Sequence, residues 1–142
     1  MVAFISSFLA SVGFAILFNI RKRKILIAGL VGGIGGLTYS ILLIVGKSTF
    51  LALFVASIVI SLSSEICARR FKTPSTTFLV CALIPLVPGG GMYYTMLEIV
   101  QDNLNGALVR GIDTVAQACS IAVGCILVSS LMKMYNKYMV RG

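Results

Sequence analysis

Five apolar segments, each long enough to cross a lipid bilayer, account for most of this chain of 142 residues. A helix needs about 20 residues to cross the roughly 30 Å hydrocarbon core. The segments cover residues 2–20, 25–45, 49–67, 76–97 and 113–132. Hydrophobic residues make up 58% of the chain and charged residues 11%, which leaves too little polar surface for a soluble domain. The sequence therefore predicts an all-α integral membrane protein, a single domain over residues 1–142 with five transmembrane helices.

Basic residues gather at alternate segment ends, and this pattern predicts the orientation in the membrane. Ten of the 12 Lys and Arg residues fall on one side of the predicted spans: Arg21, Lys22, Arg23, Lys24, Arg69, Arg70, Lys72, Lys133, Lys137 and Arg141. The other side has only Lys47 and Arg110. Because basic loops stay in the cytoplasm, we expect an external N-terminus and a cytoplasmic C-terminus. This topology explains the net charge of +8, so no nucleic-acid partner is expected.

Residues that support catalysis or metal binding are scarce. There is no histidine, and the carboxylates are limited to Glu65, Glu98, Asp102 and Asp113. Histidine is the usual metal ligand and the usual acid–base group near neutral pH. The cysteines form no CxxC pair, and we expect them to be packing residues: Cys67, Cys81, Cys119 and Cys125. The chain is therefore not expected to be an enzyme or to bind a metal or a cofactor.

Glycines recur in the second apolar segment at a spacing that favours close helix packing. Gly29 and Gly33 are four residues apart, as are Gly32 and Gly36. On a helix this spacing lets a second helix approach closely. The second helix could belong to the same chain or to another subunit, so a homo-oligomer stays open.

The fourth apolar segment contains two prolines and three consecutive glycines, which a plain membrane helix would not tolerate. Proline lacks an amide hydrogen, so Pro85 and Pro88 are expected to leave the carbonyls of Cys81 and Ile84 without their helical partners. The glycines are expected to let the chain unwind, with a new half-helix starting near Met92. Unpaired backbone groups at membrane depth persist only where protein or a watery cavity satisfies them.

The fourth transmembrane helix is therefore predicted to be broken at this Pro/Gly motif. The break is the predicted substrate site. The positive end of the half-helix would favour an anionic group such as a carboxylate, and two tyrosines would shape the pocket. Discontinuous helices near the bilayer midplane recur in transporters. The predicted substrate-binding residues are Pro85, Pro88, Gly89, Gly90, Gly91, Tyr93 and Tyr94. A proline kink tolerated by neighbouring helices is the alternative interpretation.

Glu65 is the one acid predicted inside the apolar spans proper, near the cytoplasmic end of the third. An intramembrane carboxylate suggests proton coupling or gating. Arg69 follows four residues later on the same helix face, so a structural ion pair is the competing expectation. A long external loop is expected over residues 98–112. Polar residues of the last span recur at helical spacing and could face the bundle interior or serve as packing contacts: Thr114, Gln117 and Ser120.

Two stretches resemble a known transporter family. They are residues 64–74, SEICARRFKTP, and residues 84–96, IPLVPGGGMYYTM, followed by GIDT at 111–114. These motifs are similar to those of the bacterial threonine/serine exporter family. The length and span count resemble its small five-span component, which matches the C-terminal half of fused exporters. The small component of two-component succinate exporters is of the same type.

The resemblance implies a subunit of a secondary transporter in the bacterial inner membrane, exporting threonine, serine or a dicarboxylate such as succinate. It also implies a proton-motive driving force, a larger membrane subunit as partner and no cofactor. A non-transporting membrane subunit that stabilises or regulates a partner is the alternative function. A homo-oligomeric channel lined by the fourth span is a third hypothesis.

Overall fold

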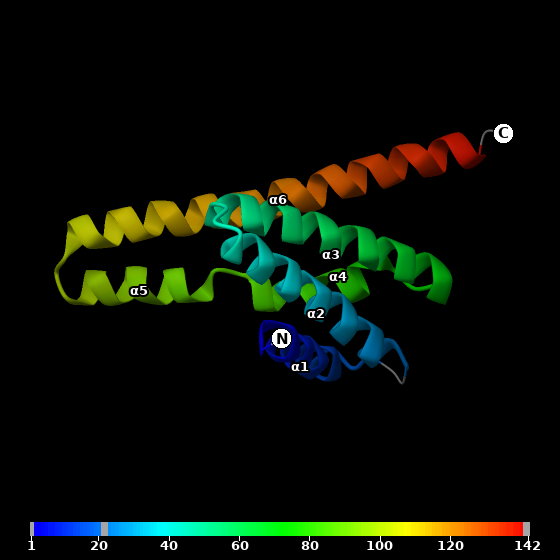
Figure 1. Cartoon of the computed structure of the whole chain (residues 1–142), viewed down its shortest axis with the longest axis horizontal. Helices are drawn as coiled ribbons and strands as arrows, with labels where there is room; N and C mark the ends of the chain where they lie inside the picture. Colours follow the sequence, from blue (N-terminus) through cyan, green and yellow to red (C-terminus); the bar gives the residue numbers. More distant parts are fainter. Residues whose placement is uncertain (1, 21–22, 141–142) are drawn as a thin grey trace.

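The chain is helical over most of the residues that the structure describes, which are 2–20 and 23–140, with side chains described to residue 135. In this computed structural model, shown in Figure 1, the elements are α1 (Val2–Leu17), α2 (Arg23–Ile44), α3 (Thr49–Phe71), α4 (Ser75–Leu83), η1 (Ile84–Leu86), α5 (Gly89–Val100) and α6 (Leu104–Val140). Three of the predicted topogenic basic residues, Arg21, Lys22 and Arg141, lie outside the described residues.

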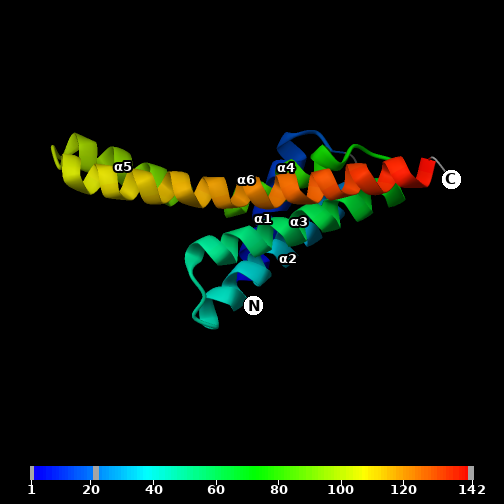
Figure 2. The same ribbon diagram turned by 90° about the horizontal axis from the view of Figure 1, so that it is seen from above.

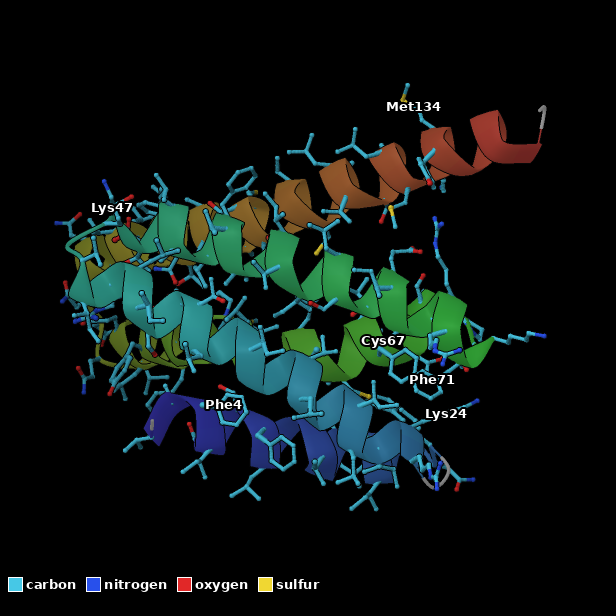
Figure 3. All side chains as sticks on the ribbon, turned by 45° about the vertical axis from the view of Figure 1, so that its right-hand side comes forward. Phe4, Lys24, Lys47, Cys67, Phe71 and Met134 are labelled. Atoms are coloured by element: carbon cyan, nitrogen blue, oxygen red, sulfur yellow. The ribbon has the colours of Figure 1, made fainter. Side chains whose placement is uncertain are left out.

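α2 contacts α1, α3 and α4, and the four helices form a bundle. Each of the four predicted packing glycines faces an α1 side chain: Gly29 faces Phe8, Gly32 faces Ser11, Gly33 faces Phe4 and Gly36 faces Ser7. A Cβ atom at position 29 or 33 would lie 2.8 Å from a ring carbon, so a larger residue would require the ring to shift. Figure 3 shows Phe4 between α1 and α2. These glycines therefore pack a helix of the same chain.

The buried core lies where α4 meets α2 and α3. One cluster joins α2, α3, α4, η1 and α6, and its buried members are Val31, Leu53, Ala56, Ile60, Ala82, Leu86 and Ile121. A second cluster surrounds Phe78, whose side chain is 0% exposed. It includes Cys81, so this cysteine is a core residue of the bundle.

α5 and the first part of α6 form a hairpin that extends beyond the ends of α2 and α3, as the two views in Figures 1 and 2 show. α5 packs chiefly against α6, and none of its residues is buried. Only residues 101–103 join the two helices, and α6 begins at Leu104. The prediction of a long loop over residues 98–112 is therefore wrong.

The hairpin tip is closed by backbone and side-chain hydrogen bonds. The Asp102 amide donates to the Ile99 carbonyl and the Asn103 amide to the Glu98 carbonyl, at 3.1 and 2.9 Å. With Asp102 at a φ of 58°, this is the pattern of a Schellman motif. The Asn103 side chain then caps α6, because its Oδ1 accepts the Gly106 amide at 3.2 Å.

Three helices are long and apolar enough to cross a membrane within the described part of the chain: α2, α3 and residues Leu104–Tyr135 of α6. Segments Ser75–Leu86 and Gly89–Val100 qualify together as a fourth candidate, although they are bent by 48° at the break. α1 has 16 residues and is shorter than a typical span. The connections alternate between the two ends of the bundle, with Lys47 at one end and Lys24 and Phe71 at the other (Figure 3). The fold is that of a multi-pass membrane protein.

Candidate functional site: a polar pocket beside a helix interruption

The helical path is interrupted between α4 and α5. After α4 the chain makes one 3₁₀ turn, η1, in which Pro85 has no amide hydrogen for the Cys81 carbonyl four residues earlier. The Ile84 carbonyl accepts a hydrogen bond from the Val87 amide at 3.2 Å. Pro88 cannot supply the usual helical partner of this carbonyl, as predicted, and the Val87 amide one residue earlier takes its place.

A tight turn centred on Pro88 directs the chain into α5. Pro88 has φ −75° and ψ 57°, and the Gly89 amide donates to the Val87 carbonyl at 2.7 Å. These values describe an inverse γ-turn. α5 begins at Gly89 rather than near Met92 as predicted. The prolines make the turn, and the three glycines are already helical.

A pocket of about 310 Å³ lies beside this turn and brings together distant parts of the chain. Its lining includes Pro85 and Pro88 together with Leu86, Val87 and the α3 residue Leu53. Its polar side chains come from three other helices: Ser7 of α1, Tyr39 and Ser40 of α2, and Gln117 of α6. Ligand pockets have volumes of about 300–1,000 Å³, so this one suits a small metabolite.

The described lining of the pocket is polar but uncharged. Ser7, Tyr39 and Ser40 contribute hydroxyl groups, and Gln117 contributes an amide with both donors and an acceptor. α5 starts directly after Pro88, and no side chain caps its first turn. The amides of that turn carry the positive end of the helix dipole. The pocket can therefore hydrogen-bond a small polar solute, and Pro88 in its lining directly precedes the first turn of α5.

The structure places some of the predicted binding residues in the pocket and the others on α5. Pro85 and Pro88 line it, whereas Gly89, Gly90, Gly91, Tyr93 and Tyr94 do not. A Cβ atom at Gly89 or Gly90 would meet no other atom within 4 Å. Gly91 is different, because it lies against the buried Thr114 of α6. This glycine permits the close packing of α5 on α6.

The two tyrosines belong to a polar cluster on the hairpin. Tyr93 and Tyr94 are 64% and 50% exposed, and their rings meet edge to face with centroids 5.4 Å apart. The Arg110 guanidinium lies 5.5 Å from the Tyr94 ring centroid. Arg110 Nε also lies 3.1 Å from Glu98 Oε1, the one salt bridge among the described residues. This cluster lies on the hairpin at some distance along α5 from the pocket.

Glu65 is half-buried on α3 and does not pair with Arg69. Arg69 instead directs its guanidinium toward α6, with Nη2 at 4.0 Å from Met132 Sδ and the guanidinium carbon at 5.6 Å from the Tyr135 ring centroid. The predicted Glu65–Arg69 ion pair is therefore wrong. Arg69 makes a cation–π contact with Tyr135 instead of an ion pair with Glu65.

The sequence interpretation missed three polar side chains of the pocket. Ser7, Tyr39 and Ser40 are polar residues inside apolar segments, and this contrast was the signal that could have identified them. Gln117 was noted for its helical spacing with Thr114 and Ser120, but only Gln117 reaches the pocket. Among the described residues no group of three metal-binding side chains comes together.

Comparison with known proteins gives a family match over nearly the whole chain. The family model described as "Threonine/Serine exporter, ThrE" matches residues 3–131. An uncharacterized protein of Haemophilus influenzae is 30% identical over 91 residues, which cover 64% of this chain and 31% of that protein. The chain thus spans about a third of the length of this curated relative. No solved structure matches the chain.

Proposed function

Because this chain belongs to the threonine/serine exporter family, we propose that it supplies part of the substrate pathway of a secondary exporter. Members of this family are transporters, so the chain is a transport component and not an enzyme. The observation that carries the proposal is the pocket beside Pro88, where a helix interruption meets polar side chains of α1, α2 and α6. Transporters use such interruptions to present backbone groups to a substrate.

The proposed substrate is threonine or serine. No charged side chain is found among the described lining residues, and two negative charges in such a cavity would be costly. A zwitterionic amino acid carries no net charge. Its carboxylate would lie near the amides that start α5, and its hydroxyl would bond Ser7, Tyr39 or Ser40. A dicarboxylate such as succinate is the alternative, and it would require basic groups from a partner.

The proposed arrangement in the bacterial inner membrane has five spans. They are α1, α2, α3, the bent pair of α4 and α5, and α6, with the N-terminus outside and the C-terminus in the cytoplasm. The concentration of Lys and Arg at one end of the bundle supports this orientation. Proton-motive force is the proposed driving energy, with Glu65 as the residue that couples or gates.

A larger membrane subunit is the proposed partner, and the α5–α6 hairpin is its proposed binding surface. An apolar groove of about 580 Å³ runs along the hairpin, with Ile99, Leu104, Leu108, Ile112 and Val115 in its lining. The Haemophilus relative shares only 31% of its length with this chain, which supports a further membrane region in the complete transporter. The exposed apolar side chains of the groove would be buried against that further membrane region.

The alternative function, a non-transporting subunit that stabilises or regulates a partner, has lost support. Its best support was the glycine-rich second span, α2, which could bind another protein. Those glycines are covered by α1 of the same chain.

Efflux of threonine and serine from loaded cells tests the proposal. We expect Tyr39→Phe, which removes one pocket hydroxyl, to lower efflux about tenfold or more, the cost of leaving a substrate group unpaired. Tyr93→Phe is the matched control, because it removes a hydroxyl on α5 outside the pocket. Equal efflux by wild type and Tyr39→Phe would contradict the pocket assignment. Full export by cells that lack this chain would support the alternative function.

A further inference from the structure

A second pocket, of about 290 Å³, lies between the end of α1 and the beginning of α4. Two of its residues carry hydroxyl groups, and its described lining has no charged side chain. It resembles the pocket beside Pro88 in volume and in its uncharged, partly polar lining, so both suit the same kind of small solute. The lining residues are Phe18, Ile20, Thr76, Thr77, Val80 and Cys81.

The second pocket lies at the basic end of the bundle. Its residue Ile20 is four residues before Lys24, and its residue Thr76 is five residues after Phe71. Lys24 and Phe71 lie together at one end of the bundle in Figure 3, opposite Lys47. In the proposed orientation this end faces the cytoplasm, from which an exporter takes up its solute. The second pocket is therefore on the side where a solute would enter.

A seam between α1 and α4 separates the two pockets. The separation along α4 is short, because Cys81 of the second pocket precedes Pro85 of the first by one helical turn, about 6 Å. The residues of the seam are small and at most 1% exposed: Ser11 and Ala15 of α1, and Cys81 and Ala82 of α4. The seam therefore carries no large side chain that interlocks the two helices.

The seam is closed in this structure, and α1 is the helix whose movement would open it. Ser11 and Ala82 both lie against Gly32 of α2, where an added Cβ atom would be 2.7 Å from the Ser11 Cβ and 3.4 Å from the Ala82 Cα. α1 packs chiefly on α2, through Phe4 and Phe8. The small side chains of the seam bury less apolar area than these rings, so separating α1 from α4 costs less than separating α1 from α2.

We propose that the second pocket is the entry site for the exported amino acid, and that a tilt of α1 on α2 opens the seam and lets the solute pass to the pocket beside Pro88. The Thr76 and Thr77 hydroxyls bind polar groups of the solute at entry. The closed seam keeps the two pockets from exchanging solute, so the pathway does not leak. Rocking of one part of a transporter against another is a recurrent way to give a site access to each side in turn. This inference rests on the function proposed above.

Protection from thiol labelling tests the entry site. The four native cysteines are replaced by alanine in the full chain, and Val80→Cys, in the second pocket, is labelled in membranes with a methanethiosulfonate ethylammonium reagent. Threonine at about ten times its dissociation constant should slow the labelling about tenfold, because it occupies the pocket. Lys72→Cys, outside both pockets, is the control and should not be protected, whereas Ala3→Cys reports on the first pocket.

The outcomes separate this inference from the proposed function. Protection of Ala3→Cys alone, or equal slowing at Lys72→Cys, would overturn the entry site and leave the proposed function standing. Protection of neither pocket would contradict both.

Cross-linking tests the seam. In the same background, Ser11→Cys with Ala82→Cys is treated with dibromobimane, which bridges two nearby thiols and fluoresces when both have reacted. Efflux is measured before and after treatment, and the bridge should lower it about tenfold or more, because the open state is then excluded. Val12→Cys with Gly29→Cys is the matched control, since it joins α1 to α2, which stay together.

Unchanged efflux after bridging of the seam would overturn the movement of α1, and so would an equal loss in the control pair. Failure of the seam pair to react would also overturn it, because the reagent reaches these buried positions only when the seam opens. For a pair that does not export before treatment, the labelling of Val80→Cys decides the proposal.

Discussion

Gly91 on α5 lies directly against Thr114 on α6, in a space that has no room for a Cβ atom. Thr114 is held in place, because its hydroxyl donates to the Arg110 carbonyl at 2.7 Å. The contact fixes the hairpin next to the interrupted helix, so the start of α5 is positioned by α6 rather than by the bundle.

We expect Gly91→Ala to destabilise the protein by about 1–3 kcal/mol, since the added methyl group overpacks a rigid contact. Unfolding in detergent, followed by circular dichroism, measures the change. Gly90→Ala is the matched control, because its Cβ has open space and alanine favours a helix. Thr114→Ala should recover much of the loss in the double variant. Equal stabilities of the two single variants would contradict this packing role.

Gly90→Leu tests the start of α5 as a carboxylate site. The side chain has room in this chain, so we expect normal insertion and stability. Threonine efflux should fall about tenfold or more, because the leucine side chain would screen the first amides of α5 from the substrate. Membrane abundance measured by immunoblot is the control. Wild-type efflux from this variant would show that these amides do not contribute to the site.

Glu65→Gln separates a functional carboxylate from a structural one. Because Glu65 and Arg69 do not pair, we expect a change in unfolding free energy below about 0.5 kcal/mol, typical of a residue outside any ion pair. The dependence of efflux on an imposed proton gradient should be lost. A large drop in stability would mean that an interaction of Glu65 supports the fold, and unchanged gradient dependence would exclude it from coupling.

The Glu98–Arg110 pair should contribute little to stability. The two side chains are 19% and 52% exposed, so solvent screens the attraction, and a double-mutant cycle with Glu98→Gln and Arg110→Gln should give less than about 1 kcal/mol. The coupling free energy of the pair should decrease further in 1 M salt, because the Debye length falls to about 3 Å and the salt screens the two charges. A coupling that does not depend on salt would contradict a solvent-exposed pair.

Thiol accessibility tests the orientation. In a cysteine-free background, Lys47→Cys is expected to react with an impermeant maleimide from outside the cell. Lys72→Cys, at the end of the bundle where α3 ends, should react only after the membrane is permeabilised. The opposite pattern would place the N-terminus in the cytoplasm.

The sequence predicted the elements whose signals are local and missed those that depend on contacts between helices. The apolar segments and the prolines located the helices and the interruption. The turn at Asp102 was missed because neither glycine nor proline marks it, and an aspartate occupies the left-handed conformation. Gly91 was interpreted as a substrate-binding residue, since only the position of α6 shows that it packs against Thr114. Arg69 was assigned the wrong partner because Tyr135 is distant in sequence.

α6 is one continuous helix of 37 residues, about 55 Å long at 1.5 Å per residue. Its N-terminal turns hold the hairpin, and Met132 and Tyr135 near its other end hold Arg69. A stiff helix held by contacts at both ends transmits a displacement of one end to the other. A tilt of the hairpin therefore displaces the contacts at the C-terminal end of α3, and the two ends of the molecule are mechanically connected through α6.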